Sequence, residues 1–326
     1  MIEHILPNLY TIEVPLPGSP LKATNSYIIK ADGRSLIIDT GMNREECLTV
    51  LSAGLKELDV DLTKADFFIT HMHADHSGLI STLATETSTI YFGETDAPSG
   101  AMAAKHNYFE QIPQIARMQG FPEDELQKAI QNHPGYKYSA RGHLEFHFVR
   151  DGDIISVGDY SFKCIATPGH TNGHMCLYEP NKKIFVAGDH ILIDITPNIS
   201  LWSEGDENPL GDYLASLDKV YDLDVKLVLP GHRRRFENHK QRIDELKKHH
   251  ETRANEVLSI LEQGSQHAYQ VASQMTWDMS YEHWHEFPSS QKWFATGEAL
   301  AHLKYLEEEG KIRRETHNQT ILFSLI

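Results

Sequence analysis

Seven histidine and aspartate residues follow short apolar runs at four places along the chain. The run ADFFIT leads into HMHADH, which supplies four of them, and the runs FKCIATPG, IFVAG and KLVLPG are each followed by one more. The seven residues are His71, His73, Asp75, His76, His170, Asp189 and His232. Neutral imidazole and carboxylate groups suit zinc, iron(II) and manganese, so this set could surround two metal ions.

The spacing within the first motif, HxHxDH, suggests how the ligands divide. Alternate residues His71 and His73 can reach one ion. Asp75 and His76, at the turn of the loop, can reach a neighbouring ion. Single members of the set have ordinary explanations, because His-x-His occurs by chance and Asp189 alone could be a turn residue. Their joint occurrence after four apolar runs favours a metal site.

Alternating strand and helix patterns position these residues. SYIIK and SLIID, separated by ADGR, predict a β-hairpin. EECLTVLSAGLKEL has the apolar spacing of a helix, and ADFFIT that of a buried strand. β-character returns after residue 148 in DIISV, YSFKCIAT, the CLYEP–NKK–IFVAG hairpin and KLVLP. This alternation favours a layered α/β (α+β) fold with the seven residues in loops at one edge.

Two further segments differ from this alternation. Residues 94–147 hold helical pieces broken by proline and glycine, which predicts a helical insertion between strands. After residue 238, apolar positions predict a long helix at 243–262, further helices near 267–277 and 291–309, and a hairpin about THNQ. Helices followed by a terminal hairpin are typical of a winged-helix module. We therefore expect a catalytic domain at 1–238 and a helical, winged-helix-like domain at 239–326.

Composition limits the class of protein. The 326 residues carry 46 acidic and 30 basic side chains, a formal net charge of −16, which argues against a surface that grips nucleic acid or anionic lipid throughout. The three cysteines are widely spaced and predict no disulfide framework. The N-terminus lacks the pattern of a signal peptide, and no apolar run is long enough to span a bilayer, so we expect a soluble, cytoplasmic protein.

The motif THMHADHSG, followed in order by TPGH, GDH and PGH, closely resembles the metallo-β-lactamase superfamily over residues 1–240. The resemblance implies a four-layer αββα sandwich with the metals at one edge. It also implies a first metal on three histidines, a second on Asp75 and two histidines, and a bridge at Asp189. The first trio is His71, His73 and His170, and the second is Asp75, His76 and His232.

The same resemblance implies a mechanism. Two divalent ions, zinc by preference with iron or manganese as alternatives, would hold a bridging hydroxide that attacks a carbonyl carbon or a phosphorus. Asp75 could take a proton in the attack, besides its role as a ligand. No serine nucleophile is then required, so we expect Ser77 to cap the helix that follows it.

Residues around the ligands are expected to orient them or to bind substrate. Asp39, in IIDTG, matches the family's aspartate near the site, with a turn residue as the alternative. His174 could orient His170 or be an ordinary strand histidine. Aromatic residues of the insertion could line an acyl pocket or form the insertion's own core; they are Tyr108, Phe109, Tyr136 and Tyr138. Arg233, which begins three consecutive arginines after His232, could bind an anionic group or be solvated.

Three functions remain open at this point. The first is hydrolysis of a thioester or ester in a small acyl substrate, in the manner of glyoxalase II and acyl-thioesterases. The second is a metal-dependent endoribonuclease or phosphodiesterase, which the winged-helix pattern favours and the acidic surface opposes. The third, less favoured, is a mononuclear-iron persulfide dioxygenase. The helix 291–309 carries more acid than base, so nucleic acid is not the favoured partner; a homodimer contact is a further option, and no membrane contact is expected.

Overall fold

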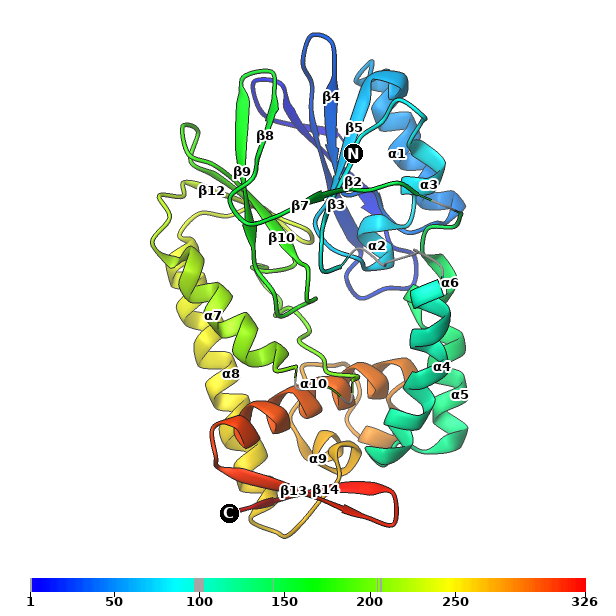
Figure 1. The fold of residues 1–326 in the computed structure, drawn as a ribbon, viewed down its shortest axis with the longest axis vertical. Helices are drawn as coiled ribbons and strands as arrows, with labels where there is room; N and C mark the ends of the chain where they lie inside the picture. Colours follow the sequence, from blue (N-terminus) through cyan, green and yellow to red (C-terminus); the bar gives the residue numbers. More distant parts are fainter. Residues whose placement is uncertain (1, 97–102, 143, 204, 206) are drawn as a thin grey trace.

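The computed structural model describes residues 2–326 apart from 97–102, 143, 204 and 206, and describes the backbone alone at 103–110. Two β-sheets pack face to face at one end of the molecule, and the C-terminal segment, residues 239–326, runs from beside the second sheet to the other end (Figure 1). None of the described helices is long and apolar enough to cross a membrane.

The first sheet has seven strands in sequence order. Neighbours from the first strand to the fourth are antiparallel and those from the fourth to the seventh are parallel. The predicted hairpin is present, with Tyr27 opposite Ile38. The strands are β1 (Ile2–Leu6), β2 (Leu9–Pro15), β3 (Ala23–Ile29), β4 (Ser35–Ile38), β5 (Ala65–Ile69), β6 (Ile90–Gly93) and β7 (His147–Val149).

The second sheet has five strands, of which the last two in the chain pair in parallel. The remaining neighbours are antiparallel, including the predicted CLYEP–IFVAG hairpin. The strands are β8 (Ile154–Val157), β9 (Tyr160–Ala166), β10 (Met175–Glu179), β11 (Ile184–Gly188) and β12 (Leu227–Pro230).

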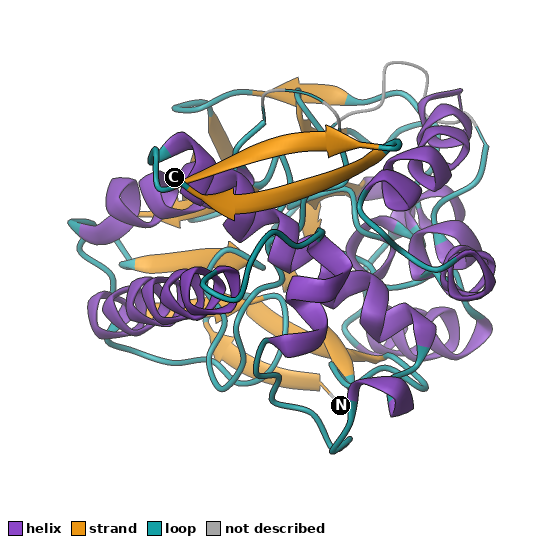
Figure 2. Ribbon diagram, turned by 90° about the horizontal axis from the view of Figure 1, so that it is seen from below, coloured by secondary structure: helices purple, strands orange, loops and turns teal. Residues whose placement is uncertain are grey.

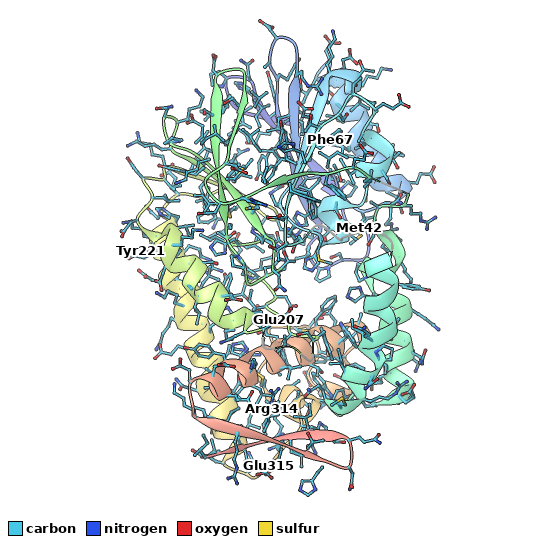
Figure 3. The ribbon with its side chains drawn as sticks, viewed as in Figure 1. Met42, Phe67, Glu207, Tyr221, Arg314 and Glu315 are labelled. Carbon is cyan, nitrogen blue, oxygen red and sulfur yellow. The ribbon has the colours of Figure 1, made fainter. Side chains whose placement is uncertain are left out.

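Side-chain alternation along the strands builds the four layers. In β5, Phe67 and Ile69 pack against α1 (Glu45–Glu57) and α3 (Ile80–Leu83) on the outer face, while Phe68 packs into the core between the sheets. Phe67 is labelled in Figure 3. The outer face of the second sheet is covered by α7 (Pro209–Tyr221) and by α8 (His239–Leu261). The expected αββα sandwich is confirmed.

The insertion is helical, as predicted. Its helices are α4 (Ala103–Met118), α5 (Glu123–Asn132) and α6 (Pro134–Tyr138). The acidic first turn of α5 begins directly after Pro122 and complements the helix dipole. Apolar residues of α4 and α5 form one cluster with Trp202 and Trp293, so the insertion packs against the C-terminal segment.

The C-terminal segment also follows the predicted order of elements. After α8 come α9 (Ala268–Gln274), α10 (Ser289–Glu308), β13 (Ile312–His317) and β14 (Thr320–Leu325). Gly310 has φ +66° just past the end of α10, as a helix terminator requires. The hairpin β13–β14 turns at Asn318 and Gln319, and Figure 2 shows it on the face of the molecule opposite the sandwich. The described residues also form the one-turn helices η1 (Leu62–Lys64), α2 (Ala74–Ser77) and η2 (Trp284–Glu286).

Candidate metal centre

The seven predicted ligands lie together beyond the carboxyl ends of four strands. The loop after β5 runs into α2 and carries four of them. The loops after β9, β11 and β12 each carry one. Their donor atoms form three overlapping groups, each with all atoms within 4.8 Å of one another. The groups are His71–His73–His170, His71–His76–Asp189 and Asp75–His76–His232.

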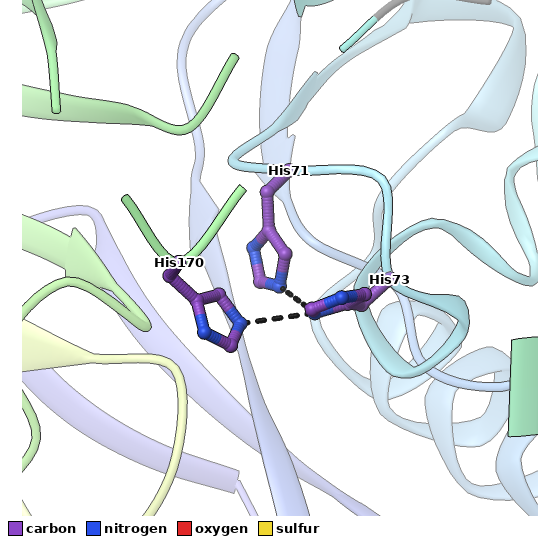
Figure 4. Close-up of side chains that lie close together, drawn as sticks. All are labelled: His71, His73 and His170. Carbon is purple, nitrogen blue, oxygen red and sulfur yellow. Dashed lines mark hydrogen bonds between the residues drawn. The ribbon is translucent and has the colours of Figure 1, made fainter. Parts of the chain in front are cut away.

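The first group consists of three histidines (Figure 4). His73 Nδ1 lies 3.1 Å from His71 Nε2 and 2.9 Å from His170 Nε2. His71 is 1% exposed, and burial together with the neighbouring histidines keeps the pKa of its ring well below the usual value. Burial and His170 likewise lower the pKa of His73 to about 3, so both rings offer lone pairs at neutral pH.

The second group combines one carboxylate with two histidines. His232 Nε2 lies 3.3 Å from His76 Nε2 and 3.4 Å from Asp75 Oδ2. Burial would raise the pKa of Asp75, but His76 and His232 outweigh it and hold that pKa below the ordinary value. Burial opposes protonation of His232, but Asp189 and Asp75 raise the pKa of the ring to about 10.

Asp189 lies between the two groups. Its Oδ2 is 3.6 Å from His170 Nε2 and 3.3 Å from His232 Nε2, and its Oδ1 is 3.5 Å from His76 Nε2. Oδ1 is buried and accepts no hydrogen bond from any described residue. A carboxylate in this place can supply an oxygen ligand to an ion in either group.

The donor set fits metal ions. Ligands bonded to one zinc ion at about 2.0–2.1 Å are themselves about 3 Å apart, which is the spacing found here. Gly231 leaves room for this convergence, because a Cβ at that position would lie 2.4 Å from Asp189 Oδ1 and 2.7 Å from His76 Cε1. A side chain there would fill the space in which the donors meet.

The outer nitrogens of three ligands are held by acceptors. His170 Nδ1 lies 2.8 Å from Asn198 O, and His232 Nδ1 lies 2.7 Å from Ala23 O. Because a carbonyl can only accept, each Nδ1 must carry a proton, so Nε2 is the nitrogen left to bind an ion once any proton on it is lost. His76 Nδ1 is held in the same way, 2.7 Å from a carboxylate oxygen of Asp39. The scaffold thus fixes which ring nitrogen of each ligand faces the site before any ion binds.

Asp39 lies where the sequence predicted. Besides contacting His76, it accepts hydrogen bonds from Thr70 N and Thr70 Oγ1, both at 2.8 Å. Since Thr70 Oγ1 donates to Asp39, its lone pairs are free to accept from His71 Nδ1, 3.0 Å away. One carboxylate therefore orients a histidine of each group, and Thr70 is a positioning residue that the sequence analysis missed.

Asp96 is a second residue that the sequence analysis missed. Its carboxylate accepts from Met72 N at 2.9 Å, Thr171 Oγ1 at 2.6 Å and Gly173 N at 2.6 Å. These contacts tie the loop after β5 to the loop after β9, so one buried side chain fixes the spacing between two ligand-bearing loops. No motif surrounds Asp96 in the sequence, so no local signal could have identified it.

His174 supports a ligand other than the one considered from the sequence. Its Nε2 accepts from Asp189 N at 3.1 Å, and its Nδ1 lies 2.8 Å from Thr167 Oγ1. The predicted orientation of His170 falls instead to Asn198. The expected role of Ser77 as a helix cap is wrong: its hydroxyl donates to the carbonyls of Met72 and His73, inside the turn that α2 forms.

A cavity of about 1370 Å³ opens onto the ligands. Met42 and Glu207, both labelled in Figure 3, line it, as do His73, Asp75 and Asp189. Its other walls come from the insertion, the loop 196–203 and the start of α10. The catalytic sandwich and the C-terminal segment therefore share this space.

The predicted substrate residues lie in different places. The side chain of Tyr108 falls outside the described residues. Tyr136 is 55% exposed on α6 and is not among the described residues that line the cavity, whereas Tyr138 does line it. The insertion therefore contributes an aromatic side chain to the cavity wall through Tyr138 and not through Tyr136.

Arg233 is not among the described residues that line the cavity. It has φ +66°, and its guanidinium donates to Pro20 O at 2.9 Å, which ties it to the loop between β2 and β3. The following arginines form ion pairs, Arg234 with Asp194 and Arg235 with Glu3. The prediction that Arg233 binds an anionic substrate group is not supported, because the run fastens loops to one another.

Comparisons with known proteins place both parts of the chain. Residues 20–232 match the family model described as the metallo-beta-lactamase superfamily, and residues 254–324 match the model described as metallo-beta-lactamase-like, C-terminal domain. A relative from Bacillus subtilis, the probable metallo-hydrolase YqjP, is 27% identical over 334 residues, covering 97% of each chain. The human acyl-coenzyme A thioesterase MBLAC2 is 24% identical over 225 residues, covering 64% of this chain and 72% of the relative.

The whole chain also resembles a solved structure. A metallo-beta-lactamase family protein from Thermus thermophilus superimposes with a TM-score of 0.83 and 28% identity, covering 99% of this chain and all of the other. The arrangement of sandwich, insertion and C-terminal segment is therefore shared across full length with a protein of this kind.

Proposed function

Since this chain belongs to the metallo-β-lactamase superfamily, we propose that it is a hydrolase that holds two divalent ions, preferably zinc, and cleaves a thioester or ester bond in an acyl substrate. The observation that carries this proposal is the convergence of five histidines and two aspartates beside a large cavity, which four of the seven residues line. Iron and manganese suit the same ligand set.

The proposed division of ligands follows the geometric groups. His71, His73 and His170 would hold one ion. Asp75, His76 and His232 would hold the other, with Asp189 shared. Divalent ions at such a site lower the pKa of water and polarise a carbonyl oxygen. Asp75 borders the cavity and, as a carboxylate at neutral pH, could accept a proton from the attacking water.

The cavity supports an acyl substrate. Near the ligands it is lined by apolar side chains that include Met42, Met72 and Ile80, and its far wall includes Trp202 and Trp293. Met72 stands between two ligand histidines and is 49% exposed, so it presents an apolar surface next to the reacting centre. Pockets that bind small molecules are mostly apolar with a few polar groups, as here. The relative named an acyl-coenzyme A thioesterase supports the same substrate class.

The test is thiol release from a panel of acyl thioesters, with metal content measured on the same samples. We expect turnover by the parent protein and almost none by Asp189→Ala. Asp218→Ala is the matched control, because it removes an exposed aspartate that pairs with Lys247 on α8.

The same assay separates the alternatives. No thiol release by metal-loaded parent protein would overturn the thioesterase proposal. Salt-sensitive cleavage of RNA would then favour the endoribonuclease, and oxygen-dependent sulfite formation with one iron per chain would favour the dioxygenase.

A further inference from the structure

The loop between β11 and α7 lies between the metal centre and the C-terminal segment. Its Asn198 carbonyl accepts from His170 Nδ1 at 2.8 Å. The Asn198 side chain faces the other way: Nδ2 donates to Glu298 Oε2 at 3.2 Å, and Oδ1 accepts from Ser200 Oγ at 2.5 Å. The residue that orients a metal ligand through its backbone is therefore held in place through its side chain by α10.

Glu298 is a buried charge with a close basic partner. It is 8% exposed, and Arg253 Nε of α8 lies 3.6 Å from its Oε1. Arg253 is itself fixed, since it pairs with Glu256 at 2.7 Å and lies over the ring of Trp277 at 4.3 Å. A buried acid is costly unless it is paired, and here the pair leaves the second carboxylate oxygen for Asn198.

Further contacts hold the same loop against the C-terminal segment. Leu201 N donates to Gly297 O at 3.1 Å. A Cβ on Gly297 would lie 2.5 Å from Trp202 Nε1 and 3.0 Å from Ser200 Cβ, so the loop approaches α10 as closely as a glycine permits. Nearer the start of the loop, Arg242 of α8 donates to Leu192 O at 2.7 Å and to Ile195 O at 2.8 Å.

From these contacts we infer that the C-terminal segment completes the metal centre, with Glu298 as a positioning residue that acts on His170 through Asn198. The inference rests on the proposed metal site and adds a role for the C-terminal segment within it. Glu298 touches neither a donor atom of the site nor the space where substrate would react. Glu298 acts on His170 indirectly: it fixes the loop, and the Asn198 carbonyl in that loop selects the His170 tautomer.

The test is Glu298→Gln in the full chain. The amide keeps the size of the side chain but cannot accept from Asn198 and pair with Arg253 at once. We expect the dissociation constant for zinc, measured by competition with a chromogenic chelator, to rise about tenfold, as for lost support of a ligand. The absorption bands of bound cobalt(II) should shift as well. Glu307→Gln is the matched control, because Glu307 is on the same helix as Glu298 but forms its ion pairs with Lys304 of α10 and Arg314 of β13, away from the loop.

A second variant removes no charge. Gly297→Ala should displace the loop by steric contact and likewise weaken zinc binding.

Asn198→Ala combined with Glu298→Gln should cost no more zinc affinity than Asn198→Ala alone, because both changes interrupt the same series of contacts from Glu298 through Asn198 to His170. Unchanged zinc affinity and cobalt bands in a folded Glu298→Gln protein would overturn the inference.

A metal-free measurement keeps this inference separate from the proposed function. In ¹⁵N-histidine spectra of the metal-free parent protein, His170 should be protonated at Nδ1, and Glu298→Gln should reduce that population. A parent protein that binds no zinc would overturn the proposed function, while the histidine spectra would still decide the role of Glu298. Retention of the parent tautomer in Glu298→Gln would overturn that role.

Discussion

Among the described residues, a cluster of histidines at the strand ends and a buried pair between α8 and α10 differ in what their ring nitrogens face. At the strand ends, outer nitrogens donate to fixed acceptors and inner nitrogens converge with carboxylates. Between α8 and α10, His250 Nδ1 lies 3.2 Å from His302 Nε2, and His302 Nδ1 donates to Glu298 O at 2.8 Å. The second cluster is a chain in which each ring donates to the next acceptor, so its lone pairs do not meet.

The difference shows what makes a buried histidine a ligand. Both clusters are buried, and burial lowers the pKa of His302 to about 3 and that of His250 below its usual range. Neutral imidazole is therefore available in both places. Of the two clusters, only the one at the strand ends adds carboxylates and directs several ring nitrogens at one space. Convergence of donor atoms is therefore what distinguishes this candidate metal site from a pair of packed histidines.

The largest expected effect is at the shared carboxylate. Asp189→Ala should lower kcat/KM for thioester hydrolysis on the order of a thousandfold, which corresponds to about 4 kcal/mol of transition-state stabilisation. The reason is that Asp189 contacts both groups of donors. Metal content and activity measured together check this prediction. Near-parent activity at reduced metal content would contradict a site that depends on both groups.

A smaller loss is expected one step away from the ligands. Asp39→Asn should reduce activity and metal affinity by about 10- to 100-fold, because an amide no longer selects the protonated Nδ1 of His76. Asp66→Asn is the control, since Asp66 belongs to the same sheet but pairs with Arg34. Equal losses in the two variants would show that general stability, and not orientation of the ligand, accounts for the effect.

The sequence indicated that the seven candidate ligands lie together because each is in a segment that follows an apolar strand, so its position is set by local pattern. Periodicity and turn residues also predicted an α/β layer architecture, the insertion and the terminal hairpin, whereas the four-layer αββα arrangement followed from the family resemblance. Among the groups that orient these residues, Asp39 was predicted, but Ala23 and Asn198 could not be, because they act through backbone carbonyls that the type of side chain does not reveal. For Arg233 the sequence left an anionic substrate group and a solvated charge as alternatives, because the direction of its side chain depends on a left-handed backbone and on a hydrogen bond to Pro20 O, 213 residues away along the chain.

The helical pair should respond in stability and not in metal content. His250→Leu leaves the Nε2 lone pair of His302 buried without a donor, which should cost about 1–3 kcal/mol of unfolding free energy. Denaturant unfolding measures that loss, and metal analysis of the folded protein should give the parent stoichiometry. A lower metal content in the variant would contradict this expectation, because it would mean that the helical pair also supports the metal site.

The smallest effect concerns acid. In the folded protein the pKa of His302 is about 3 and that of His250 is also lowered, both through burial first, whereas unfolded histidine has a pKa of about 6.5. Below pH 6.5 the unfolded chain therefore binds protons that these folded rings do not, so stability falls as the pH falls toward 3. One such ring contributes about 1 kcal/mol between pH 6 and pH 5.

The free energy of unfolding, measured for parent and His250→Leu proteins across this range, should fall less steeply with acid in the variant. The ligand histidines are present in both proteins and cancel in the difference. Parallel declines would mean that the pair is already protonated when folded, and the contrast between a packed pair and a converging one would then need a different physical basis.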